Sequence, residues 1–148
     1  MTFPYAQQND ESRRRLQALV QGLSEADLAR STGYGWTVAA LLAHLAFWDQ
    51  RMIMILKRWK EEGLDTSAMD TGVVNDSLRV ICHALEPREA IELCLSSAEA
   101  ADGELARLTA EEVKQLEEHA AATDTQFRMN RSLHRNGHLD DIEALLNK

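Results

Sequence analysis

One long stretch of the chain can form only a helix. The run VAALLAHLAFWDQRMIMILKRWKEE, residues 38–62, contains neither proline nor glycine and lies between Thr37 and Gly63. Threonine is a common N-cap residue, glycine often follows the last helical turn, and Leu, Ala, Met, Lys and Glu all favour helix. The run therefore predicts a long helix, and its apolar stripe predicts that the helix is largely buried.

The N-terminal third also favours helix. The chain contains only two prolines, at positions 4 and 87, and no run alternates apolar and polar residues as a strand does. A first helix is predicted from about Ala6 to Gly22. Ser24 with Asp27 three residues later is a weak capping pattern for a short turn, and the GYG at 33–35 then breaks the chain.

Further helices are predicted in the C-terminal half. A looser stretch at 64–72 leads into a helical segment near Val73–Leu85, and Pro87 begins a helix that runs to about Leu108. Thr109 and Glu112 form a capping pattern for AEEVKQLEEHA, and a last helix is expected from 123–125 to the end. Four long helices with short additions predict an all-α, four-helix bundle and a single domain over residues 1–148.

Composition excludes several classes of protein. The 148 residues include 16 Lys and Arg against 24 Asp and Glu, a formal charge of −8. Such a chain offers no broad basic face for phosphates, so nucleic acid is not an expected partner. Cys82 and Cys94 match no disulfide or zinc-ribbon pattern and are interpreted as small buried residues.

The expected location is the cytoplasm, without a membrane. The N-terminal residues MTFPYAQQNDESRRR lack the apolar segment of a signal peptide. The longest apolar stretch, Val38–Trp48, is shorter than the roughly twenty residues that span a bilayer.

Two of the five histidines stand four residues apart in the predicted last helix, within LHRNGH. Side chains at i and i+4 share one helical face, so His134 and His138 can direct both imidazoles at one point. Phe127 and Leu145 fall on the same face, with Ile142 at its border, and we therefore expect this face to look into the bundle.

A third histidine points to the same interior. His44 shares a helical face with Ala40, Leu41, Trp48 and Ile55, the stripe that should be buried. Three neutral imidazoles from two helices would leave a divalent cation one open coordination position, which is typical of catalytic rather than structural zinc. Because imidazole must be neutral to bind, metal affinity is expected to fall as pH drops through about 6.5.

The same residues permit structural interpretations. The pair could be partly exposed, and His44 could be a core histidine bonded to a carbonyl. Gly137 is accounted for equally well by a close approach of another group and by a simple kink. His83 is expected to pack or to cap a helix, and His119 to be solvated.

Other polar residues have two possible roles. On the helical wheel Asn130, Arg131 and Asp141 lie near the face of His134, and Arg51 lies near that of His44. They could orient a ligand or bind an anionic substrate, or they could form interhelical ion pairs or a solvated border. Trp48 is interpreted as a core anchor rather than a substrate platform.

The two stretches GYGWTVAALLAHLAFWDQR and HRNGHLDDI resemble the DinB-like superfamily, also called DinB/YfiT-like metalloenzymes. The family pattern places a Trp and a helix cap before the first histidine and an HxxxH on the last long helix. The matching positions are Trp36 and Thr37 at the helix start, His44, and the pair His134 and His138.

The resemblance implies an up-down-down-up bundle that holds a divalent metal, zinc or nickel, through three histidines, often in a homodimer. Characterised relatives include thiol-dependent S-transferases and a mycothiol-dependent maleylpyruvate isomerase, in which a low-molecular-weight thiol is activated at the metal. No substrate-binding motif of the family is matched in the middle of the chain, so the reaction and its small-molecule substrate are not carried over.

Two classes of function remain open from the sequence. The first is a metal-dependent enzyme, either a thiol-dependent S-transferase or isomerase, or a hydrolase that uses an acidified water. The second is a non-enzymatic bundle, a stress-related or interaction protein whose metal, if any, is structural or adventitious.

Overall fold

A computed structural model describes residues 2–63, 69–123 and 127–148. Within these ranges the regular structure is helical, apart from one antiparallel bridge between Ser31 and Thr37. The helices are α1 (Ala6–Gln21), α2 (Glu25–Ala29), α3 (Val38–Glu62), α4 (Thr71–His83), α5 (Pro87–Ala106), α6 (Ala110–Thr123) and α7 (Ser132–Leu146).

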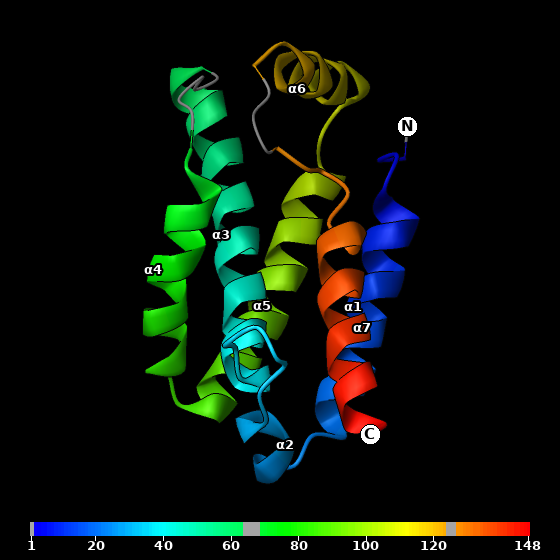
Figure 1. Ribbon diagram of the computed structural model, residues 1–148. Coiled ribbons are helices and arrows are strands. Elements are labelled where there is room, and N and C mark those ends of the chain that lie inside the picture. The colour runs from blue at the N-terminus through cyan, green and yellow to red at the C-terminus, as the bar shows by residue number, and fades with distance from the viewer. Residues whose placement is uncertain (1, 64–68, 124–126) are drawn as a thin grey trace.

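Four of these helices form the bundle. α3 packs on α5 and α7, and α1 packs on α5 and α7. Figure 1 shows α1 and α7 running one way and α3 and α5 the other. α4 returns the chain from the end of α3 to the start of α5, so that α3 and α5 run parallel. The expected all-α bundle with up-down-down-up topology is confirmed, and α6 lies across one end of it.

Most helix ends lie where their capping residues predicted them. The Thr37 hydroxyl accepts a hydrogen bond from the Ala40 N–H, and Gly63 ends α3 with φ +85°. Ser24 and Asp27 form a reciprocal capping box on α2, and Thr109 and Glu112 exchange hydrogen bonds at the start of α6. These interactions are local, so the sequence carries enough information to place them.

The predicted start of the last helix was wrong. α7 begins at Ser132, and residues 127–131 are not helical, whereas 124–126 lie outside the described residues. Asn9 of α1 replaces a helical turn here: its Oδ1 accepts from the N–H groups of Arg131 at 2.7 Å and Ser132 at 3.2 Å, and its Nδ2 donates to the Met129 carbonyl at 3.1 Å. Phe127 is consequently not on the helical face of the histidine pair and packs in a separate apolar cluster.

α3 is long and apolar enough to cross a membrane by length and composition, which the shorter stretch Val38–Trp48 alone did not indicate. Its position in the bundle accounts for this composition, because 67% of its most apolar 18-residue window is buried. The helix is therefore the core helix of the bundle, and it places His44 in the interior.

Candidate metal centre

Three imidazoles from two helices converge inside the bundle. His44 lies on α3, and His134 and His138 occupy neighbouring turns of α7. The Nε2 atom of His134 is 3.2 Å from Nε2 of His44 and 3.1 Å from Nε2 of His138. One ligand atom from each ring lies within 4.8 Å of the others, so these three residues, the histidine cluster, could hold one ion.

The distances fit a shared ion better than they fit hydrogen bonds. A neutral imidazole nitrogen carries either one proton or one lone pair in the ring plane, so Nε2 of His134 cannot satisfy both neighbours. Two nitrogens bound tetrahedrally to one zinc ion, at about 2.0–2.1 Å each, lie about 3.3 Å apart. The donor set is therefore suited to zinc or a similar cation in both type and spacing.

Burial keeps the three rings neutral. Burial lowers the pKa of His44 to about 4, with a further contribution from the charge of His138. The pKa of His134 falls to about 2, chiefly through burial and then through His138, His44, Arg131 and Arg128. The lone pairs of His44 and His134 are thus available well below pH 6.5, which moves the expected loss of metal affinity to a lower pH.

The Nδ1 atoms of His44 and His138, which face away from the centre of the cluster, have different surroundings. His44 Nδ1 is buried and has no hydrogen-bond partner among the described residues. Nδ1 of His138 lies 3.8 Å from Asp141 Oδ2, too far for a hydrogen bond. Burial lowers the pKa of His138, and the Asp141 carboxylate opposes that change. Asp141 therefore acts on the cluster through its charge.

Aromatic rings and two cavities surround the cluster. The His44 ring meets Trp36 edge to face at 4.9 Å and Trp48 at 6.4 Å. A cavity of about 250 Å³ is bounded by all three histidines, and a second of about 100 Å³ is bounded by His44 and His134. The cluster is therefore inside the fold and accessible to a small molecule.

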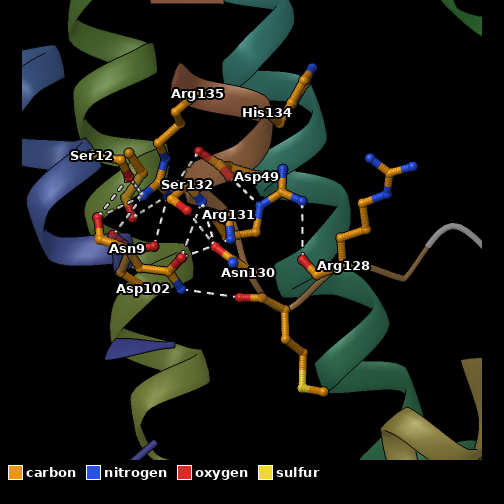
Figure 2. A network of polar contacts seen from close by, with 12 residues as sticks. Asn9, Ser12, Asp49, Asp102, Arg128, Asn130, Arg131, Ser132, His134 and Arg135 are labelled. Atoms are coloured by element: carbon orange, nitrogen blue, oxygen red, sulfur yellow. Dashed lines mark hydrogen bonds and ion pairs between the residues drawn. The ribbon is translucent and has the colours of Figure 1, made fainter. Parts of the chain in front are cut away.

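About one helical turn from the cluster lies a second set of buried polar groups, which we call the ion network (Figure 2). Its members are Asp49 of α3, Asp102 of α5, Asn9 and Ser12 of α1, Arg131 just before α7, and Arg135 of α7. Arg135 pairs with Asp102 at 2.7 Å and with Asp49 at 3.4 Å. Arg131 pairs with Asp49 at 2.8 Å. These bonds fix the N-terminal part of α7 against three other helices.

The structure separates the four accessory residues proposed from the sequence. Arg131 forms the interhelical ion pair that was its alternative role. Asn130 precedes α7, where its Oδ1 accepts from the Ser132 N–H and hydroxyl, so its wheel position does not apply. Asp141 borders the larger cavity, and the Arg51 guanidinium lies 5.7 Å from the Trp48 ring centroid.

Expectations about three further residues have mixed outcomes. Gly137 is exposed within a continuous helix, and apart from its chain neighbours and its own helical backbone no described atom lies within 4 Å of a Cβ built there, so close approach does not account for it. His83 caps the start of α3, which is one of the two roles expected for it: its Nε2 accepts a hydrogen bond from the Thr37 N–H at 3.2 Å. His119 is half-buried rather than fully solvated.

Sequence reasoning missed three residues near the centre. Asp49 and Arg135 are 2% and 1% exposed, and helical-wheel reasoning assigns such charged residues to the surface. Asp49 nevertheless stands within the most apolar helix, which is a usable indication of a buried charge. Asn75 of α4 borders both cavities, and nothing in its local sequence indicates this.

The family comparison agrees with this geometry. A model of the DinB superfamily matches residues 8–138, which include all three histidines. No curated protein and no solved structure matches the chain. The match covers most of the sequence, and the chain therefore belongs to the DinB superfamily.

Proposed function

We infer that this member of the DinB superfamily binds one divalent cation through His44, His134 and His138 and uses an open coordination position for chemistry. Zinc and nickel are the proposed ions, because imidazole nitrogen suits both. One observation supports the site above all: Nε2 of His134 stands at 3.1–3.2 Å from two other ring nitrogens, which one proton cannot satisfy.

The proposed reaction class is thiol-dependent S-transfer or isomerisation of a small substrate in the cytoplasm. A cation at the cluster would favour the thiolate form of a low-molecular-weight thiol. The protein's own residues would exclude bulk water with Trp36 and Trp48, keep the three rings neutral by burial, and admit substrate through the cavity of about 250 Å³.

Hydrolysis is the second candidate. His134 and His138 are only partly buried, so water can reach the same position. A cobalt-substituted protein distinguishes the two: a visible spectrum that changes on adding small thiols supports thiol chemistry. A spectrum that responds to pH and to no thiol supports hydrolysis.

We also propose a homodimer. Val73, Val80 and Ile81 of α4 are 61%, 74% and 60% exposed, which is unusual for an apolar helix face in a monomer. Light scattering of the purified chain tests this, with Val80→Lys expected to shift the mass to that of a monomer.

Metal analysis tests the site itself. Protein purified without a histidine tag or added metal should contain about one divalent ion per chain. His134→Ala should lose the ion, and His119→Ala, which changes a histidine outside the cluster, should keep it. A metal-free wild type whose stability is unchanged by chelator would leave the non-enzymatic alternative.

A further inference from the structure

The two cavities at the histidine cluster differ in charge. The larger one is bordered by Thr32, Tyr34 and the carboxylate of Asp141. The smaller one, on the other side of His134, is bordered by Arg128 and Arg131 with Trp48, Thr71 and Asn75. In a chain of formal charge −8, a cationic wall beside the metal centre is a local departure from the overall charge.

Arg128 differs from the two arginines that follow it. Arg131 and Arg135 are buried in ion pairs with Asp49 and Asp102. Arg128 is exposed, and no ion pair of its guanidinium is found among the described residues; its backbone carbonyl accepts from Arg131 Nη1 at 3.2 Å. In Figure 2 its side chain points away from the ion network. Within the described ranges no carboxylate neutralises its charge, which can therefore serve a ligand in the smaller cavity.

Asn75 supplies a second donor in the same wall. Its Oδ1 accepts a hydrogen bond from Trp48 Nε1 at 3.1 Å. An indole N–H can only donate, so this bond fixes which side of the amide is oxygen. The amide NH₂ group has no acceptor among the described residues, and Asn75 borders both cavities.

We propose that Arg128 and the Asn75 amide bind a carboxylate of the substrate, so that this protein selects small anionic thiols or substrates over neutral ones. This assignment rests on the proposed function, because the other end of the ligand occupies the open position at the cluster. A cavity of about 100 Å³ fits a small planar carboxylate, which a guanidinium can bind through two parallel hydrogen bonds.

Two ligands that differ in one group test the assignment. The cobalt-loaded full chain is titrated with 3-mercaptopropionate and with 3-mercaptopropionamide, and the visible spectrum reports binding. Wild type should bind the carboxylate about tenfold more tightly than the amide, since a hydrogen bond to a charged group adds about that much. Arg128→Gln should bring the ratio close to one, mainly by weakening the binding of the carboxylate.

Two more variants separate the Asn75 donor from a general effect of charge. Asn75→Asp keeps an acceptor for Trp48 and replaces the NH₂ donor with a carboxylate oxygen, so the preference should be lost or reversed. Arg107→Gln makes the same charge change as Arg128→Gln at an exposed site at the end of α5 and should keep the wild-type ratio.

Each outcome has one meaning. A tenfold preference that Arg128→Gln leaves intact means that the carboxylate binds elsewhere, and it overturns the assignment while the metal site stands. Equal affinities of the wild type for the carboxylate and the amide also overturn the assignment and leave the metal site standing. Failure to take up cobalt overturns the proposed function and this assignment together.

Discussion

The histidine cluster and the ion network are neighbouring polar regions that share α3 and α7, and they differ in completeness. In the network, Asp49 pairs with Arg131 and Arg135, and Asp102 pairs with Arg135 and with Arg13. Among the network side chains in the described ranges, only Arg135 Nε is buried without a partner. In the cluster, three ring nitrogens face one another and one proton cannot satisfy them.

This difference separates two uses of buried polarity. A network whose charges are matched inside the protein costs little to keep buried and orients α7. A cluster of neutral donors with no charged partner at its centre is suited to a group from outside. The network therefore positions the cluster, and the cluster is the proposed cation site. Changes to the network should affect folding, and changes to the cluster should affect ligand-dependent stability.

The largest expected effect is on the network. Asp49→Ala leaves Arg131 buried without its carboxylate partner and Arg135 with Asp102 alone, and the free energy of unfolding should fall by about 3–5 kcal/mol. Urea denaturation without metal measures this. Asp76→Ala, which removes an exposed ion pair with Arg79, should cost less than about 1 kcal/mol. Equal losses of unfolding free energy in the two variants would show that the buried ion pairs contribute no more to stability than an exposed one.

Near neutral pH the cluster should contribute to stability mainly through its ion. At a free metal concentration about 1,000 times Kd, wild type should gain about 4 kcal/mol. His134→Ala should lose most of this gain and change little in chelator, whereas His119→Ala should behave as wild type. Thermal melts with and without metal measure the gain. A large loss for His134→Ala in chelator would make the cluster structural.

The pH dependence of the metal-free protein should also come from the cluster. As pH falls below about 6.5, unfolded His44 takes up a proton, but folded His44 does so only near its pKa of about 4. The unfolded state therefore binds more protons in this window, and stability is complete above pH 6.5 and lost toward pH 4.

The pKa difference of His44 corresponds to a loss of about 3 kcal/mol. Urea midpoints in chelator between pH 7 and 4.5 should therefore fall less steeply for His44→Gln than for wild type. Parallel slopes would show that burial of His44 does not shift its titration.

A smaller effect is expected where the network meets the backbone. Asn9→Ala removes the acceptor for the Arg131 and Ser132 N–H groups and should cost about 1–3 kcal/mol. Because these bonds fix the start of α7, metal affinity should weaken as well. Gln8→Ala, at the exposed neighbouring position, should leave both stability and metal affinity unchanged. If Asn9→Ala also left both unchanged, the network would not position the metal site.

The smallest effect concerns Gly137. Alanine there meets open space within a helix, so Gly137→Ala should raise the free energy of unfolding by about 0.5–1 kcal/mol and leave metal affinity unchanged. Gly103→Ala on α5 has equally open surroundings and should give a similar gain. A loss at position 137 alone would indicate that the glycine is needed beside the histidine pair.

Local rules predicted much of this fold. Thr37, Gly63 and Pro87 mark helix ends through interactions within a few residues, and the i,i+4 spacing of His134 and His138 was sufficient to place both rings on one side of α7. The inward stripe that contains His44 followed from the apolar composition of α3.

Contacts between distant segments were not predictable in the same way. The start of α7 depends on Asn9, more than 120 residues earlier in the chain. The burial of Arg135 depends on carboxylates from α3 and α5, and a helical wheel for one segment includes neither. The role of Asn75 depends on the bond from Trp48 to its amide oxygen.

X-ray absorption of the metal-loaded protein tests the central claim most directly. The account predicts three imidazole nitrogens at about 2.0–2.1 Å from the ion in wild type and no sulfur ligand from the protein. A spectrum with fewer than three imidazoles, or with a ligand sulfur from Cys82 or Cys94, would contradict it.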